Sequence, residues 1–291
     1  MKNSNIPIFI LVAFVIILII YIKEYNTSKY THLPGHKRVA LCIAGAVGIK
    51  TGIYQAGKLD YVNFRAIERC IQTHIIEANP GVEFEIFIHT WNPDLEQDLK
   101  RLYDPKKILC EDNNIYRNEI KSKISGVNTD EHQFRQISHL LSIKKSLTMA
   151  LDDPTEFDCF IRLRPDVLLW KDMKLDEYVT ARHAYVNGHY TPKHGEGNGD
   201  FHHILNKNDA IVMSSLYDRC SPCVATMHKI IQTLFKEATG RNFIPDSIIP
   251  GKHQEVLRKL YRLSVKTGYL DDFKLREYGL TTEELMTYRG F

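Results

Sequence analysis

The chain lacks several features that would place it in a class at once. Its six cysteines are too few for a disulfide scaffold in 291 residues. Cys220 and Cys223 have metal or redox spacing, but no second pair completes a zinc site, so we expect a local disulfide or no role. Internal repeats and low-complexity segments are absent. A net charge of +3 without a basic tract argues against nucleic acid as a partner.

What is present is an ordinary globular composition and one long hydrophobic run. With 44% hydrophobic and 25% charged residues, the chain can form one large α/β domain or two small ones. Residues 6–22 are apolar throughout and lie between Lys2 and Lys23, which is typical of a membrane-spanning helix. No small residues follow to form a signal cleavage site. We therefore expect a tail at 1–5, a membrane anchor at 6–22, a stalk at 23–36 and one folded domain at 37–291.

Lysines stand on both sides of the apolar run, at Lys2 on one side and at Lys23 and Lys29 on the other. The excess of positive charge that usually marks the cytoplasmic side is therefore missing. The sequence predicts an anchor in the lipid bilayer and leaves its orientation open.

Hydrophobic periodicity predicts alternating strands and helices in the folded domain. Short apolar runs bounded by turn residues indicate buried strands, and apolar residues at every third or fourth position indicate helices. Because strand, helix and strand follow one another repeatedly, we expect an α/β fold with a mostly parallel sheet flanked by helices. Strands are expected at 37–45, 84–89, 107–110, 157–163 and 201–205, and helices at 61–78, 131–151, 207–216, 223–238 and 253–265.

The most informative segment is 157–170, where an apolar run carries Arg162, Arg164 and Asp166 to its end. Pro165 cannot occupy a central strand, so the strand must stop near Leu163. Ligands of open α/β sheets bind outside the carboxyl ends of the strands, where arginine forks can pair with phosphate. Alternate residues of a strand share a face, so Arg162 and Arg164 cannot be assigned separately. The alternative is a salt bridge that only closes the strand end.

Further candidates follow the first two predicted strands of the domain. Gly45 permits close backbone approach to a nucleotide, although Gly45-Ala-Val-Gly48 is not a phosphate-binding fingerprint. Trp91 could stack on a sugar or a base, and Asn92 could hydrogen-bond it. Trp91 fits equally well as a core side chain.

Four features stand out in chain order: Leu41-Cys-Ile-Ala-Gly45, Phe87-Ile-His-Thr-Trp-Asn92, Gln133-Phe134 with Ser142-Ile-Lys-Lys-Ser146, and Ile161-Arg-Leu-Arg-Pro-Asp-Val167. Together they resemble GT-A-type glycosyltransferases over about residues 37 to 265. The resemblance implies a GT-A-like, Rossmann-like fold in a membrane-anchored enzyme that uses a nucleotide-sugar donor and acts on a glycan.

The resemblance also implies roles at the site. In that fold an Asp-x-Asp motif holds a divalent cation, Mn²⁺ or Mg²⁺, against the donor's diphosphate. This chain has Arg-Pro-Asp instead, so only Asp166 could ligate a metal or hold the ribose, and we expect Asp166 and Asp200 to be the catalytic residues. An acidic residue near the acceptor corresponds to Asp200, our candidate for the general base. His202 and His203 are alternative bases, and the plain reading of Asp200 is an ordinary turn aspartate.

Lys144 and Lys145 could reach phosphate, but charged pairs on a helix usually face solvent. Glu255, at the start of a predicted helix, is most simply a residue that complements the helix dipole. None of these three residues is therefore among the predicted site residues.

The resulting hypothesis is a single-pass membrane enzyme that transfers a hexose or pentose from a nucleotide-diphosphate donor to a glycan. Such an enzyme is expected in the Golgi, the endoplasmic reticulum or a virus-modified membrane. One alternative is a sugar-phosphate transferase that uses the same donor. Another is a membrane-anchored carbohydrate-binding module without activity, which the missing first aspartate of the metal motif favours.

Overall fold

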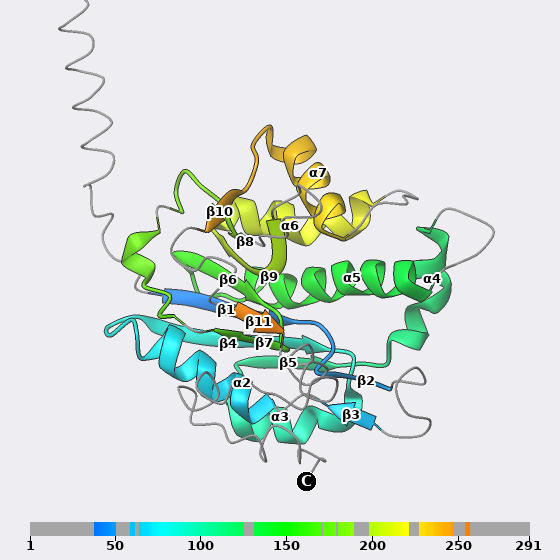
Figure 1. Ribbon diagram of the computed structural model, residues 1–291, viewed down its shortest axis with the longest axis horizontal. Coiled ribbons are helices and arrows are strands. Elements are labelled where there is room, and N and C mark those ends of the chain that lie inside the picture. Colours follow the sequence, from blue (N-terminus) through cyan, green and yellow to red (C-terminus); the bar gives the residue numbers. More distant parts are fainter. Residues whose placement is uncertain are drawn as a thin grey trace, which may run out of the picture. The chain divides into compact units, whose positions relative to one another are not determined.

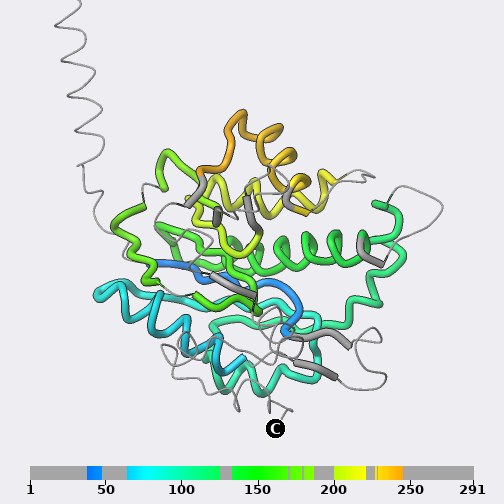
Figure 2. The backbone as a smooth tube through the Cα atoms, viewed as in Figure 1, coloured from blue at the N-terminus to red at the C-terminus, as the bar shows by residue number. Residues whose placement is uncertain are grey.

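The computed structural model describes residues 38–50, 59–61, 64–124, 131–169, 171–178, 180–188, 198–220, 227–246 and 254–256. Figure 2 traces the backbone. The chain divides into two units, Met1–Gly35 and His36–Phe291, and every described residue belongs to the second. The predicted anchor at 6–22 and stalk at 23–36 lie outside the described residues. Within the described ranges, no helix is long and apolar enough to span a membrane.

A seven-stranded sheet forms the centre of the described unit, in the order β10-β8-β9-β6-β1-β4-β5. The pairs β1–β4, β4–β5, β1–β6 and β8–β10 are parallel, and β9 runs antiparallel to both neighbours. The predicted mostly parallel sheet is therefore confirmed. Its strands are β1 (Arg38–Ala44), β4 (Glu83–Thr90), β5 (Lys107–Cys110), β6 (Cys159–Leu163), β8 (Tyr185–Gly188), β9 (Asn198–Leu205) and β10 (Ile244–Asp246).

Helices cover both faces of this sheet, as Figure 1 shows. Helices α5, α6 and α7 lie on one side, and α2 and α3 lie on the other. The long helix predicted at 131–151 is confirmed within these bounds. The helical elements are α2 (Phe64–Ile71), the π-helical η1 (Gln72–Ile76), η2 (Pro93–Leu95), α3 (Glu96–Tyr103), η3 (Asn113–Tyr116), α4 (Arg117–Ser122), α5 (Glu131–Leu151), η4 (Leu175–Glu177), α6 (Lys207–Arg219) and α7 (Met227–Thr239).

Alternation along β1 separates two hydrophobic cores. Val39, Leu41 and Ile43 pack with residues of α2 and α3, whereas Ala40 and Cys42 pack with residues of α5, α6 and α7. Successive side chains of a strand point to opposite faces, so one buried strand supplies both cores. The side chains toward α5 are small, which leaves room on that face for larger groups from neighbouring strands.

Two smaller sheets complete the described part, and one of them corrects a prediction. Strands β2 (Gly48–Lys50) and β3 (Leu59–Tyr61) pair with each other, and β7 (Val167–Leu169) pairs antiparallel with β11 (Gln254–Val256). The helix predicted at 253–265 is therefore wrong over residues 254–256, where Glu255 lies opposite Leu168 rather than in a first helical turn. Short apolar segments fit either period, and pairing with β7 decides this one.

The connections create a switch point at the centre of the sheet. From β1 the chain passes to β4 and β5 on one side, and later returns to β6 on the other side of β1. In open α/β sheets, a crevice forms outside the carboxyl ends of two strands whose connections diverge in this way. The residues that follow β1 and β6 therefore occupy the position where a ligand is expected.

Candidate active site

The site is built at the end of β6, where the strand stops at Leu163 as Pro165 requires. The backbone N–H of Arg164 still donates to the carbonyl of Phe201 in β9, at 3.0 Å. This bond places Arg164 beside Asp200. Asp200 lies inside β9 and is 6% exposed, so the reading as an ordinary turn aspartate is wrong.

Arg164 connects the two predicted catalytic carboxylates. Its Nε and Nη2 donate to Oδ1 and Oδ2 of Asp166, both at 2.8 Å, and its Nη1 donates to Oδ1 of Asp200 at 3.0 Å. The guanidinium also lies 5.5 Å from the centre of the Phe201 ring. Burial acts to lower the pKa of Arg164, but the charges of Asp166 and Asp200 outweigh burial and raise it. The sequence-predicted Arg164, Asp166 and Asp200 thus form one ion-paired cluster.

Arg162 has a different environment from Arg164, a distinction the sequence did not provide. It is fully buried, donates through Nη1 to the carbonyl of Asp200, and donates through Nη2 to Nε2 of His139. Its Nε has no hydrogen-bond partner within the described ranges. Burial is the main reason that its pKa falls to about 9. A side chain in this position orients the backbone at Asp200 and does not open onto a ligand.

His139 is a site residue that the sequence reading missed. It lies on α5, and its Nε2 stands 3.8 Å from Oδ2 of Asp200. Because Nε2 accepts a hydrogen bond from Arg162, the neutral ring carries its proton on Nδ1. The available signal was a histidine among the apolar positions of the amphipathic segment 131–151, between the buried Ile137 and Leu140.

Gly45 allows close approach to its backbone, but the groups that approach it are side chains of the protein and not a nucleotide. Its φ is +134°, a conformation that residues with a side chain rarely adopt. A Cβ at this position would lie 3.2 Å from Cδ of Pro165 and 3.4 Å from Nδ1 of His139. Its N–H donates to the carbonyl of His89 at 3.2 Å. The missing side chain therefore lets the end of β1 pack directly against the Arg-Pro-Asp segment.

Asn92 fixes the segment that follows Gly45. Its Oδ1 accepts from the backbone N–H of Val47 at 2.8 Å and from the Thr90 hydroxyl at 3.0 Å, and the residue is buried. Asn92 therefore couples the end of β4 to the end of β1. Both ends lie beside the switch point.

Trp91 packs inward, in agreement with its reading as a core side chain. Its ring meets His89 edge-on at 4.5 Å and lies 5.8 Å from the ring of Tyr116. Its Nε1 is buried and finds no hydrogen-bond partner among the described residues. Trp91 is partly buried and packs against the core on the α5 side of the sheet.

A second polar network supports the end of β4. Glu111 accepts from the Tyr116 hydroxyl at 2.7 Å and from Lys145 at 2.6 Å, and lies 3.0 Å from Nε2 of His89. Nδ1 of His89 lies 2.8 Å from the Ser142 hydroxyl. Burial is the main cause that lowers the pKa of His89 to about 4. The order Ser, His, Glu matches a hydrolytic triad, but Ser142 and His89 are fully buried, so no substrate reaches them.

The remaining polar candidates are also occupied or buried. Lys144 pairs with Asp218 at 2.7 Å. His202 and His203 are both fully buried, and burial is the main cause that holds the pKa of His203 well below its usual value. Neither histidine is placed to reach an acceptor hydroxyl.

The residues at the site do not fit a divalent cation. Both carboxylate oxygens of Asp166 are held by the guanidinium of Arg164. Over the described ranges, no group of three His, Cys, Asp or Glu side chains could hold a metal ion. A cation at Asp166 would have to displace Arg164 and then sit beside that same positive charge.

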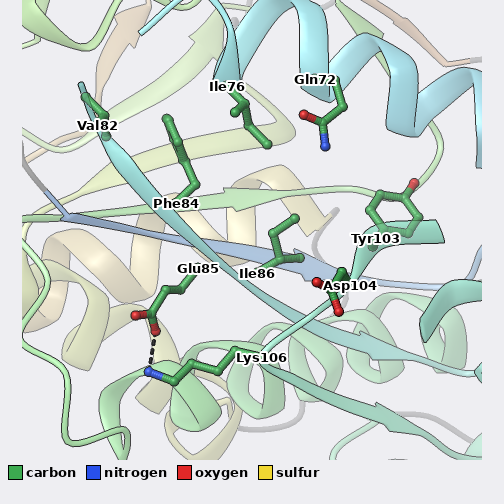
Figure 3. A pocket seen from close by; sticks show the side chains of 9 residues that line it. All are labelled: Gln72, Ile76, Val82, Phe84, Glu85, Ile86, Tyr103, Asp104 and Lys106. Carbon is green, nitrogen blue, oxygen red and sulfur yellow. Dashed lines mark hydrogen bonds and ion pairs between the residues drawn. The ribbon is translucent and has the colours of Figure 1, made fainter. Parts of the chain in front are cut away.

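A cavity of about 510 Å³ lies near the start of β4 (Figure 3). The Arg164 cluster, in contrast, lies at the carboxyl ends of the strands. Apolar side chains from β4 and η1 form one wall, and the ion pair of Glu85 with Lys106 stands beside it. The cavity is far from the carboxyl ends where α/β sheets bind ligands, and it contains none of the cluster residues. Its lining residues are Gln72, Ile76, Val82, Phe84, Glu85, Ile86, Tyr103, Asp104 and Lys106.

Comparisons with known proteins give a limited likeness. No protein-family model and no curated protein sequence matches the chain. Among solved structures, it resembles mouse xyloside xylosyltransferase 1 in its apo form, with 10% identity, a TM-score of 0.35, and coverage of 72% of this chain and 84% of the other. It also resembles the glycosyltransferase GlyE of Streptococcus pneumoniae, with 12% identity, a TM-score of 0.39, and coverage of 88% and 57%.

Two further solved structures are similar to the chain at the same level. A glycosyltransferase involved in glycosylation of the major capsid of PBCV-1 has 9% identity, a TM-score of 0.34, and coverage of 72% of this chain and 81% of the other. The 4-diphosphocytidyl-2C-methyl-D-erythritol synthase of Anaerococcus prevotii has 13% identity, a TM-score of 0.38, and coverage of 74% and 87%. All these TM-scores are below 0.5, so the chain's own residues must carry any functional proposal.

Proposed function

We propose that this protein is a glycosyltransferase with a GT-A-like domain, which moves a sugar from a nucleotide-diphosphate donor to a glycan acceptor. The observation that carries the proposal is the Arg164 cluster at the switch point between β1 and β6. One arginine there is held by the buried carboxylates of Asp166 and Asp200. An oriented cation at this edge suits an anionic leaving group.

Each member of the cluster has a role in the proposed transfer. The bond between the anomeric carbon of the sugar and the diphosphate oxygen breaks, and the diphosphate leaves with the electron pair. The acceptor oxygen bonds to that carbon, and its proton passes to the carboxylate of Asp200. Arg164 stabilises the charge that develops on the diphosphate. Asp166 keeps the guanidinium in one orientation through its two hydrogen bonds.

Membrane attachment belongs to the same proposal. Residues 6–22 would anchor the enzyme in the bilayer, 23–36 would form the stalk, and 37–291 would be the catalytic domain. The donor and the glycan would then meet at a membrane surface, in the Golgi, the endoplasmic reticulum or a virus-modified membrane.

One observation favours a second candidate, a carbohydrate-binding module without activity. The guanidinium of Arg164 is paired with two carboxylates of the protein, Asp166 and Asp200, as it would be in a purely structural ion-pair cluster. Such a module would bind a glycan and leave every nucleotide sugar intact. A sugar-phosphate transferase, in contrast, would consume the donor and add phosphate together with the sugar. Product mass separates that reaction from simple sugar transfer.

The test uses the full chain in detergent with a panel of nucleotide sugars and glycan acceptors, with Mn²⁺, with Mg²⁺ and with a chelator. We expect one donor to release a nucleoside diphosphate and the acceptor to gain the mass of one sugar. Arg164→Met should lower kcat by about a hundredfold or more, the usual loss when one positioned donor to a developing anion is removed. Asp166→Asn should abolish turnover, because Arg164 then loses the carboxylate that orients it.

Asp209→Asn is a matched control for these variants. Asp209 is a buried aspartate that pairs with Arg241, outside the cluster. This variant should keep full turnover. The proposal fails if Asp166→Asn remains as active as the native chain, or if no donor is consumed by a folded protein that still binds glycan.

A further inference from the structure

We infer that Arg164 takes the place of a divalent cation, so that the site binds the diphosphate of its donor directly through a guanidinium. This inference rests on the proposed function and names how that site recognises its ligand. The motivating observation is the mismatch between the cluster and a metal ion: the carboxylate that would hold the metal already holds an arginine. The expected cation is thus supplied by the chain.

Arg164 keeps hydrogen-bonding capacity for a ligand. A guanidinium has five N–H donors. Three of them are used, at Nε and Nη2 toward Asp166 and at Nη1 toward Asp200. Counting the described residues, one N–H therefore remains on each terminal nitrogen, and these groups can donate to phosphate oxygens.

The exposed fractions of the side chains in the cluster also indicate that Arg164 is the residue that meets the ligand. The side chain of Arg164 is 23% exposed, whereas those of Asp166 and Asp200 are 4% and 8% exposed. Arg162 is fully buried. Arg164 is therefore the most exposed charged group of this cluster, and the two carboxylates hold it in place.

The charge balance gives the inference a distinctive consequence. Arg162 and Arg164 carry two positive charges, and Asp166 and Asp200 carry two negative ones, so the cluster is neutral. If arginine binds the diphosphate, the nearby carboxylates repel it, and Asp166→Asn should strengthen binding. If a metal held by Asp166 binds the diphosphate, the same substitution should weaken it. The two models predict changes of opposite sign.

Stronger binding and lost turnover are compatible in one variant. Removing the charge of Asp166 lowers the repulsion of a bound diphosphate, but it also breaks the bidentate contact that orients Arg164. Catalysis depends on interactions that are stronger in the transition state than in the ground state. A misoriented guanidinium therefore binds the ground state well and stabilises the leaving group poorly.

The experiment measures binding of inorganic pyrophosphate to the full chain in detergent by calorimetry, first with chelator and then with Mn²⁺. We expect binding in chelator, with an affinity that Mn²⁺ changes little. Asp166→Asn should tighten binding in chelator by about tenfold, Arg164→Met should abolish it, and the control Asp209→Asn should leave it unchanged. Binding that appears only with Mn²⁺, or that weakens in Asp166→Asn, would overturn the inference.

A complementary variant restores the missing carboxylate. Arg164→Asp places two aspartates at 164 and 166 and removes the competing guanidinium. Electron paramagnetic resonance should then detect bound Mn²⁺ in the variant and none in the native chain. Bound Mn²⁺ in the native chain, lost in Asp166→Asn, would contradict the inference.

These results are independent of sugar transfer. Metal-free pyrophosphate binding by a chain that consumes no donor would support the inference and refute the proposed function. Donor turnover that strictly requires Mn²⁺ would support the proposed function and refute the inference.

Discussion

The buried histidine at the end of β4 predicts a measurable loss of stability in acid. His89 is fully buried, and its pKa is lowered to about 4 from 6.5, mainly by burial. The unfolded chain therefore binds a proton between pH 6.5 and pH 4 that the folded chain does not. The free energy of unfolding must fall as the pH falls through this window. The difference amounts to about 3 kcal/mol, at about 1.4 kcal/mol per pH unit.

The charged groups around His89 do not remove this effect. Glu111 accepts hydrogen bonds and acts to raise the pKa of His89, while Lys145 acts to lower it. Burial raises the pKa of Glu111, but bonds from Lys145, Tyr116 and His89 outweigh burial and lower it. Over most of this window, above the usual pKa of a glutamate, His89 is the group of this network that gains a proton on unfolding, and Glu111 adds to the loss of stability only toward the acid end.

His89→Gln is the informative variant, because an amide can replace both hydrogen bonds of the ring without titrating. Chemical denaturation should be followed by tryptophan fluorescence, since Trp91 lies against His89. Between pH 7 and pH 4.5 the native chain should lose about 2 kcal/mol more than the variant. Equal losses in the two proteins would refute the assignment of the acid sensitivity to His89.

Two further predictions concern the backbone around the site, and a third concerns an exposed ion pair at the start of β1 and β4. Gly45→Ala should cost about 1–3 kcal/mol and most of the turnover, since its Cβ would press on Pro165 at a strained φ. Gly240→Ala, with a φ of +69° and no atom within 4 Å of the added Cβ, should keep turnover, and equal activity of the two variants would contradict this reading. Asn92→Ala should cost about 1–3 kcal/mol in denaturation experiments, because the N–H of Val47 loses its acceptor; a change below 0.5 kcal/mol would count against it. Glu83→Ala breaks an exposed ion pair with Arg38 and should change stability by less than about 0.5 kcal/mol; a larger loss would show that this pair is structural.

Local signals in the sequence predicted the scaffold of the site well. Pro165 cannot pair within a sheet, and this property placed the end of β6 at Leu163. The apolar spacing in 131–151 predicted α5, because one face of that helix must cover the sheet. With strand ends known, the grouping of polar residues at the carboxyl edge followed from the parallel topology.

The long-range contacts could not be predicted in the same way. Arg162 and Arg164 are two residues apart, yet one is sealed under α5 and the other reaches the surface, because β6 ends between them. His139 comes into the cluster only through the packing of α5 on β6. Asp200 was expected in a turn, but β9 begins at Asn198 and continues its pairing to Arg164.

A crystal structure of the full chain with a bound nucleoside diphosphate tests the central claim most directly. The account predicts that the diphosphate lies outside the carboxyl ends of β1 and β6, with its oxygens within hydrogen-bond distance of the terminal nitrogens of Arg164. A diphosphate bound elsewhere, for example against Lys106 in the cavity near the start of β4, would contradict the assignment of the site.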